Sequence, residues 1–286
     1  MGHGLAQVFG SAGHPVRVYD AQPAALASLH ERIAANLDSL GRSDDFRHLV
    51  SAHADMADAV AGAGVVIEAA PEKLALKQQI FAQLVELAAP DALLASNTSV
   101  IPISEIAAGL PSAERILGTH WWNPPFLVPL VEVVGTAQTS PATIEAMLAL
   151  LTAVGKTPVH IRKDVPGFVG NRLQHALWRE AIAIVAAGIA DAETVDTVVK
   201  ASFGRRLAVL GPLENADLVG TDLTLDIHNA VLSHLDRTPG PSPYLESLVA
   251  EGRLGMKSGQ GFRAWTGETA AALRRRVFDY LKAYKG

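Results

Sequence analysis

The chain contains no cysteine among its 286 residues, and this absence removes several classes of chemistry. Disulfide bonds, thiolate zinc sites and cysteine nucleophiles are all excluded. Nothing in the composition points to an oxidising compartment, so we expect a cytoplasmic protein. The ten histidines include no His-x-x-x-His pair. We therefore expect no metal site.

Clusters of basic residues and long apolar runs are also scarce. The chain has 24 Lys and Arg against 29 Asp and Glu, and its longest basic run is Arg274-Arg275-Arg276. Nucleic acid is therefore not an expected partner. No uninterrupted apolar stretch reaches the roughly 18 residues that span a bilayer, and the first residues lack the basic start and apolar run of a signal peptide. We expect neither a membrane segment nor a secretory leader.

What is present is enough apolar sequence to fold, because 49% of the residues are hydrophobic and 19% are charged. In the first half, short β-branched runs alternate with segments of helical periodicity, which is typical of βαβ units and predicts a parallel sheet. The expected strands are 16–19, 65–67, 93–95, 116–117 and 131–134, and the expected helices include 23–40 and 74–87.

The pattern changes after Val159-His160-Ile161, where the turn residues Asp164 to Gly167 precede a sequence that is nearly all helical in character. The stretch 168–187 is apolar along its length, as expected for a helix buried in a bundle or a dimer interface. Further helices are expected at 191–202, 217–235, 244–252 and 269–283. The prediction is an α/β domain over residues 1–163 and an all-helical domain over 164–286.

The N-terminal glycines resemble part of a dinucleotide-binding turn. Gly2 and Gly4 precede an apolar helical pattern, and glycines let a backbone approach a pyrophosphate at a helix N-terminus. Asp20 ends the following strand, where a carboxylate accepts hydrogen bonds from ribose hydroxyls and favours NAD over NADP. Flexible terminal glycines and a helix-capping Asp20 explain the same residues.

The first strand and the first glycines of such a motif, about a dozen residues, are missing from the sequence as given. We expect translation to begin upstream of Met1. For the chain as written, we expect reduced stability and weak NAD binding, because a central strand and part of the pyrophosphate cradle are lost.

Polar residues end several apolar segments at the positions where open α/β sheets bind ligands. His120 follows a short strand and Glu132 lies in the next one, so neighbouring strands can bring a base and an orienting carboxylate together. An unperturbed histidine pKa of roughly 6.5 suits proton removal from an alcohol. Ser99 and Asn171 can hydrogen-bond the substrate. Each of these residues also has a purely structural explanation as a turn, strand or helix-start residue.

Several separated segments together resemble the 3-hydroxyacyl-CoA dehydrogenase family over essentially the whole chain. The segments are Met1 to Phe9, Tyr19-Asp20, Glu68 to Glu72 with Lys77, Ser96 to Ser99, His120 to Pro124, Leu130 to Glu132, Lys163 to Phe168, Asn171-Arg172 and Leu254 to Gly259.

The resemblance implies a Rossmann-type NAD-binding domain followed by an all-helical C-terminal domain that forms most of a homodimer interface, with a substrate cleft between the domains. It implies that His120 is the catalytic base, that Glu132 is its paired carboxylate, and that Ser99 and Asn171 position the substrate. The residues expected to line NAD, with Gly2 and Gly4, are Asp20, Glu72, Lys77, Asn123 and Lys257.

The sequence departs from the acyl-CoA members of that family in two places. The motif after His120 reads Trp121-Trp122-Asn123-Pro-Pro where those members usually have Phe-Phe-Asn-Pro, and no lysine lies between Asp20 and Val50. Our leading hypothesis is NAD-dependent oxidation of a 3-hydroxyacyl-CoA, in fatty acid metabolism. The alternatives are a dehydrogenase of a non-CoA hydroxy acid or alcohol, of the gulonate, carnitine or pyridine-carboxylate type, and a non-catalytic relative of the crystallin type.

Overall fold

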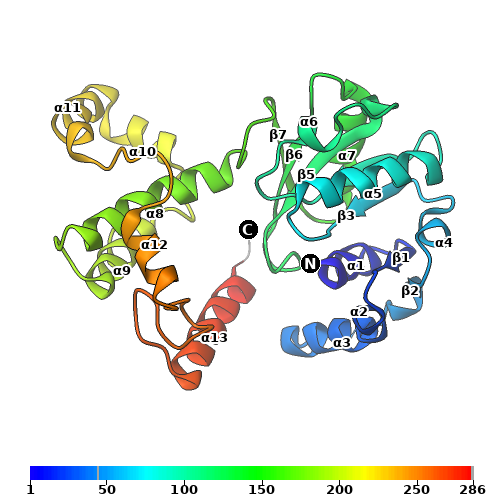
Figure 1. The fold of residues 1–286 in the computed structure, drawn as a ribbon, viewed down its shortest axis with the longest axis horizontal. Coiled ribbons are helices and arrows are strands. Elements are labelled where there is room, and N and C mark those ends of the chain that lie inside the picture. The colour runs from blue at the N-terminus through cyan, green and yellow to red at the C-terminus, as the bar shows by residue number, and fades with distance from the viewer. Residues whose placement is uncertain (44, 285–286) are drawn as a thin grey trace. The chain divides into compact units, whose positions relative to one another are not determined.

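The computed structural model describes residues 1–43 and 45–284 (Figure 1). The chain divides into two compact units. The first contains Met1–Arg172 and the C-terminal stretch that begins at Asp279, and the second contains Leu173–Phe278. The first unit is a mixed α/β structure, and the second is helical, so the predicted fold class is confirmed.

The main sheet has five strands in the order β3-β4-β5-β6-β7. Its strands are β3 (Val65–Glu68), β4 (Leu93–Ser96), β5 (Ile116–Trp121), β6 (Leu130–Val134) and β7 (Thr157–Ile161). All neighbouring pairs are parallel except β5 and β6, which are antiparallel. The sheet is therefore mixed rather than purely parallel. The physical reason is the short connection from Trp121 to Leu130, since a parallel crossover needs a dozen or more residues.

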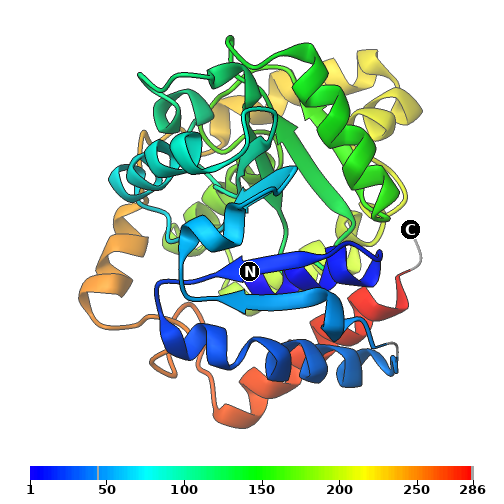
Figure 2. The ribbon, with the colours of Figure 1, turned by 90° about the vertical axis from the view of Figure 1, so that its right-hand side faces the viewer.

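A second, smaller sheet pairs β1 (Val16–Tyr19) with β2 (Val50–His53) in parallel. Figure 2 shows these strands side by side as two blue arrows. Within the described residues, neither strand is hydrogen-bonded to the five-stranded sheet. Strand β2 was not predicted, because Val50 is the one β-branched residue among its four and the sequence therefore shows no β-branched run there.

Helix α1 (Gly2–Ser11) packs against the cores of both sheets. Leu5 and Val8 lie in the cluster formed by β4, β5, β6 and α7, whereas Ala6 packs with Val50. The other helices of this unit are α2 (Pro23–Ala27), α3 (Leu29–Leu40), α4 (Met56–Val60), α5 (Leu74–Leu87), α6 (Ile103–Ile106) and α7 (Pro141–Ala153), with 3-10 turns η1 (Arg47–Leu49) and η2 (Ala113–Arg115). The single helix predicted over 23–40 is broken at Ser28.

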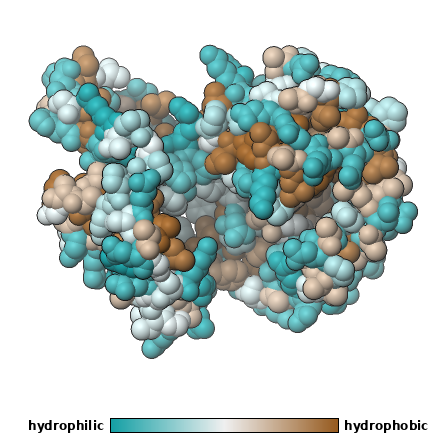
Figure 3. Space-filling model, viewed as in Figure 1, coloured by the Kyte–Doolittle hydropathy of each residue, from teal (hydrophilic) through white to brown (hydrophobic). Residues whose placement is uncertain are grey.

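The helical region contains α8 (Gly170–Ala186), α9 (Ala192–Ala201), η3 (Phe203–Arg205), α10 (Pro212–Val219), α11 (Thr221–Val231), η4 (Leu232–His234), α12 (Pro243–Ala250) and α13 (Gly267–Ala283). None of the residues of α8 to α11 is fully buried. Apolar residues are visible on the surface of this region in Figure 3. Among the described residues, no helix is both long and apolar enough to cross a bilayer.

Candidate active site

His120 and Glu132 form a buried pair in the main sheet. They lie directly opposite each other in the antiparallel β5–β6 ladder. His120 Nδ1 lies 2.7 Å from Glu132 Oε2, and the two side chains are 5% and 1% exposed. Opposed residues of an antiparallel pair have their Cβ atoms close together, so the register alone brings the imidazole to the carboxylate.

The second oxygen of Glu132 is held by backbone N–H groups at the start of α8. Oε1 accepts hydrogen bonds from the backbone N–H groups of Val169 and Gly170, each at 3.0 Å. Left-handed backbone at Gly167 and Phe168, with φ of 74° and 49°, turns these N–H groups toward the carboxylate. The positive end of the helix dipole favours the anion at this point.

The electrostatics of the pair favour an ionised carboxylate. Burial alone raises the pKa of Glu132, but the hydrogen bonds from His120, Gly170 and Val169 outweigh it and leave this pKa below its usual value. An acceptor-only carboxylate at Nδ1 requires the proton of a neutral imidazole to sit on Nδ1. Nε2 of His120 is then left as a proton acceptor.

Two aromatic rings pack beside the imidazole. The ring centroids of Trp122 and Phe168 lie 5.2 Å and 5.8 Å from that of His120. Trp122 also lies over Gly170, where an added Cβ would come within 2.5 Å of its Cζ2 atom. A side chain at position 170 would therefore displace the indole. This role of Gly170 was missed from the sequence, which placed the glycine only within the helical stretch expected over 168–187.

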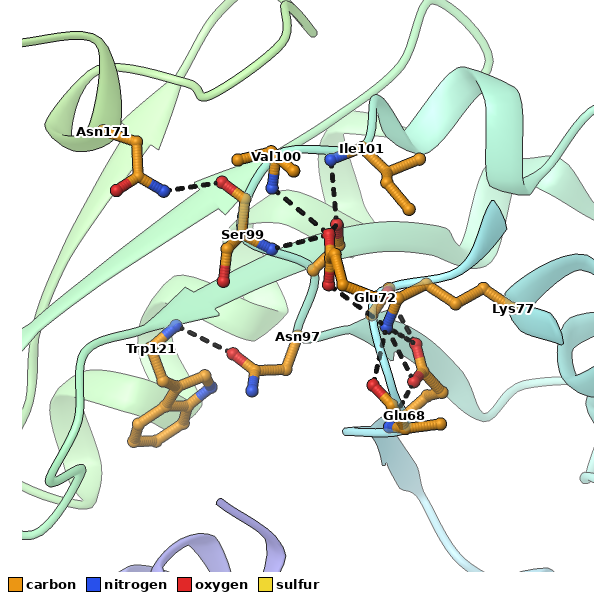
Figure 4. Close-up of polar contacts among 12 residues, drawn as sticks. Glu68, Glu72, Lys77, Asn97, Ser99, Val100, Ile101, Trp121 and Asn171 are labelled. Carbon is orange, nitrogen blue, oxygen red and sulfur yellow. Dashed lines mark hydrogen bonds and ion pairs between the residues drawn. The ribbon is translucent and has the colours of Figure 1, made fainter. Parts of the chain in front are cut away.

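Ser99 and Asn171 lie together, linked through the main chain of Ser99. Asn171 Nδ2 donates to Ser99 O at 2.8 Å (Figure 4). Asn97, in the same loop after β4, accepts a hydrogen bond from Trp121 N at 3.0 Å. The loop is thus tied to the end of β5, the strand that carries His120.

The expected cofactor residues of the N-terminal segment lie around α1 and the end of β1. Gly4 is buried, and an added Cβ would meet Pro125 Cγ at 2.7 Å, whereas a Cβ at Gly2 would meet no atom within 4 Å. No acidic residue lies in the first turn of α1. Asp20 is exposed and accepts a hydrogen bond from Gln22 N at 2.9 Å. An open helix N-terminus without a competing carboxylate suits an anionic pyrophosphate, so these residues fit a dinucleotide.

Glu72 and Lys77 are in very different environments. Glu72 is one-third exposed, and its Oε1 accepts bonds from Thr98 Oγ1 and from the N–H groups of Ser99 and Val100. Lys77 is completely buried, and its ammonium binds Glu68 and the carbonyl of Ala70. The resemblance implied that Lys77 contacts the cofactor, but in this structure its donors are used within the protein.

The remaining expected residues are exposed. Asn123 follows Trp122 and precedes a cis peptide bond to Pro124. Lys257 lies in a turn between Gly255 and Gln260, in the helical unit. Across residues 1–43 and 45–284, no group of three or more His, Asp or Glu side chains is arranged to hold a metal ion.

Comparison with known proteins gives matches along nearly the whole chain. Residues 1–165 match the model of the 3-hydroxyacyl-CoA dehydrogenase NAD binding domain, and residues 167–265 match the C-terminal domain of the same family. The 5-formyl-3-hydroxy-2-methylpyridine 4-carboxylate 5-dehydrogenase of Mesorhizobium japonicum is 34% identical over 279 residues, which cover 96% of this chain and 90% of the relative. A probable 3-hydroxybutyryl-CoA dehydrogenase of Bacillus subtilis is 36% identical over 278 residues, covering 94% of this chain and 96% of the relative.

The fold is equally well matched by a solved structure. A crystal structure of a 5-formyl-3-hydroxy-2-methylpyridine 4-carboxylic acid 5-dehydrogenase, an NAD⁺-dependent dismutase, has a TM-score of 0.92 and 34% sequence identity. The match covers 99% of this chain and 93% of that one.

Proposed function

Because this chain belongs to the 3-hydroxyacyl-CoA dehydrogenase family, we propose that it oxidises the 3-hydroxyl group of a 3-hydroxyacyl-CoA to the 3-oxoacyl-CoA. The family and its relatives identify the protein as an NAD-dependent oxidoreductase that acts on CH–OH groups. The observation that carries the proposal is the buried His120–Glu132 pair, in which the carboxylate is fixed on both oxygens.

His120 is the proposed catalytic base. Its Nε2 atom takes the proton of the substrate hydroxyl, and the same group returns a proton in the reverse reaction. Glu132 holds the Nδ1–H tautomer and stabilises the imidazolium that forms. NAD, when bound, supplies the hydride acceptor at its nicotinamide ring. Ser99 and Asn171 hydrogen-bond the substrate oxygens and orient the carbinol carbon.

The proposed cofactor site combines a helix N-terminus with scattered polar side chains. Gly2 and Gly4 place the start of α1 where its N–H groups bind the pyrophosphate, and Asp20 binds the ribose hydroxyls. The family resemblance adds Glu72, Asn123 and Lys257 to this set. It also assigns Lys77 to NAD, but the ammonium of Lys77 binds Glu68 and Ala70 within the protein. We further propose the domain boundary at residue 163, with a substrate domain over 164–286. A cytoplasmic location and a place in fatty acid metabolism stay predictions.

A second candidate substrate is a small non-CoA alcohol or aldehyde, as on a pyridine carboxylate. Two observations favour it. Trp122 stands where the acyl-CoA members usually have phenylalanine, and its ring centroid lies 5.2 Å from that of His120. The larger indole extends the aromatic surface beside the base. The solved pyridine-carboxylate dehydrogenase has a TM-score of 0.92 over 99% of the chain. An aromatic substrate stacks on such a wall favourably.

We also propose that two copies of the chain form a homodimer through the helical region. Helices α8 to α11 have no buried residues of their own, yet they carry many large apolar side chains, including Leu213 at 80% exposed and Leu218 at 71% exposed. Apolar surface of this extent is unfavourable in water and typical of an obligate interface. Light scattering on the purified chain should give twice the mass of 30.1 kDa, whereas a monomer would refute this assignment.

The test of the reaction is NADH formation, followed by absorbance, with NAD and parallel 3-hydroxybutyryl-CoA, gulonate, carnitine and a hydroxymethyl pyridine carboxylate. His120→Gln should lower kcat by about 10³-fold or more, because the base is lost. His160→Gln is the matched control, since His160 is an exposed residue of β7. Turnover of the CoA ester supports the leading proposal, and turnover of the pyridine compound alone supports the second. No turnover of any alcohol would overturn both.

A further inference from the structure

We propose that the buried Lys77 is a positioning residue, which holds the loop that carries Ser99 in the conformation that binds substrate. It acts through the carboxylates of Glu68 and Glu72. The inference rests on the proposed function to the extent that Ser99 contacts the substrate. It differs from a direct cofactor contact by Lys77, and the two assignments lead to different measurements.

The ammonium of Lys77 is fully engaged inside the protein. Its side chain is 0% exposed, and Nζ lies 2.9 Å and 3.0 Å from the two oxygens of Glu68 and 3.3 Å from Ala70 O. An ammonium has three donors, and these three acceptors use them. A buried lysine persists only when it is paired in this way. Lys77 therefore has no donor left for a bound molecule.

The same ammonium neutralises part of the charge on Glu72. Lys77 Nζ lies 3.8 Å from Glu72 Oε2, and Figure 4 shows the two carboxylates on either side of it. Burial alone raises the pKa of Glu72, but the bond from Thr98, the charge of Lys77 and the backbone N–H groups of Val100 and Ser99 outweigh it and lower this pKa. Glu72 therefore stays ionised as an acceptor.

The ionised Glu72 gathers consecutive donors from the loop after β4. Its Oε1 accepts the hydroxyl of Thr98, Ser99 N at 3.2 Å and Val100 N at 3.3 Å. Thr98 Oγ1 in turn accepts Ile101 N at 3.0 Å. Four successive residues are thereby fixed by one carboxylate, directly or through Thr98, so the position of the loop depends on the charge state of Glu72.

The loop is held from its other side by Asn171, whose Nδ2 binds Ser99 O at 2.8 Å. Both main-chain polar groups of Ser99 are thus occupied. Its hydroxyl has no hydrogen-bond partner within the described part of the chain and remains free for a ligand. Glu68, the other partner of Lys77, is also held by a side chain next to the loop, since Ser96 Oγ donates to its Oε2 at 2.6 Å. The network fixes the backbone and leaves one functional group available.

The test compares Lys77→Met combined with Glu68→Gln, which removes both buried charges, with Thr98→Val, which leaves the Lys77–Glu68 pair intact. Lys73→Met is the control, because Lys73 is an exposed lysine just before α5. Both test variants should lower kcat/KM by about tenfold to a hundredfold through misplacement of Ser99. The dissociation constant of NAD, from fluorescence titration, should stay within about twofold of wild type.

Hydrogen exchange of the peptide that contains residues 97–101 provides a readout independent of turnover. Exchange should be faster in both test variants and unchanged in Lys73→Met. A loss of NAD affinity in proportion to kcat/KM would overturn the inference in favour of a cofactor contact. Unchanged exchange, or lower thermal stability with unchanged kinetics, would also overturn it. If the wild-type protein turns over no alcohol while both test variants exchange faster than wild type, the result contradicts the proposed function and not this inference.

Discussion

Replacing Glu132 with glutamine exchanges one carboxylate oxygen for an NH₂ group and so tests the hydrogen bonds that hold His120. The carboxylate accepts three hydrogen bonds, one from His120 Nδ1 at 2.7 Å and two from backbone N–H groups at 3.0 Å. A glutamine has one acceptor oxygen, and the two N–H groups of Val169 and Gly170 draw it to their side. Its NH₂ group then faces Nδ1 and forces the imidazole proton onto Nε2, where it prevents proton removal.

The expected loss in kcat for Glu132→Gln is about 10³-fold to 10⁴-fold, because the corresponding Asp→Asn change in serine proteases costs about 10⁴ through the wrong tautomer. The exchange of charged for neutral hydrogen bonds should lower the free energy of unfolding by roughly 1–3 kcal/mol. NADH formation at saturating NAD and substrate measures the first, and denaturant unfolding measures the second. Glu145→Gln, at an exposed position of α7, is the control.

A variant that keeps more than a tenth of wild-type kcat would refute the tautomer argument. The pH dependence gives an independent check. The folded pKa of Glu132 lies below its usual value, so its contribution to stability is present above about pH 4.3 and is lost as the pH falls through the folded pKa. Glu132→Gln should therefore lose less stability than wild type on acidification.

Three further outcomes are expected. Gly170→Ala should lower the free energy of unfolding by about 1–3 kcal/mol and should lower kcat, because the new Cβ would come within 2.5 Å of Trp122. An unchanged free energy of unfolding in denaturant would contradict this. Gly4→Ala should weaken NAD binding in a fluorescence titration, because its Cβ would come within 2.7 Å of Pro125 and shift the start of α1. Burial lowers the pKa of Lys156 to about 8, so the unfolded chain binds more protons above that pH. The contribution of Lys156 to stability should therefore rise as the pH increases from about 8 toward about 10.4, and Lys156→Met should remove this contribution from the pH dependence measured by denaturant unfolding.

The sequence predicted the elements whose residues carry a clear apolar pattern. Helix α5 has its predicted bounds, and β1 has its predicted four residues. The residue types of the base pair were also predicted. Their approach was also expected, from two neighbouring strands. The antiparallel β5–β6 pairing that places them directly opposite each other was not, because the sheet was expected to be parallel.

The buried network around Lys77 was missed for a physical reason. Lysine usually lies at the surface, and the family resemblance already gave Lys77 a role beside the cofactor that accounted for its positive charge. The signal that could have corrected this is helical periodicity. Lys77, Phe81 and Leu84 fall on one face of α5, and they are its three buried residues. A lysine on the apolar stripe of a helix predicts a buried partner of opposite charge.

The separation of the two sheets has a consequence for the order in which parts of the structure unfold. Asp20 lies at the end of the β1–β2 sheet, whereas His120 and Glu132 lie in the five-stranded sheet. Sheets without a shared hydrogen-bond ladder can unfold as distinct cooperative units, and a two-stranded unit has the lower stability. In the chain of residues 1–286, mild denaturant should therefore release the end of β1 that carries Asp20, the residue we propose for ribose binding, by local unfolding while the His120–Glu132 pair remains ordered. Cofactor affinity and the order of this pair would then be lost at different denaturant concentrations.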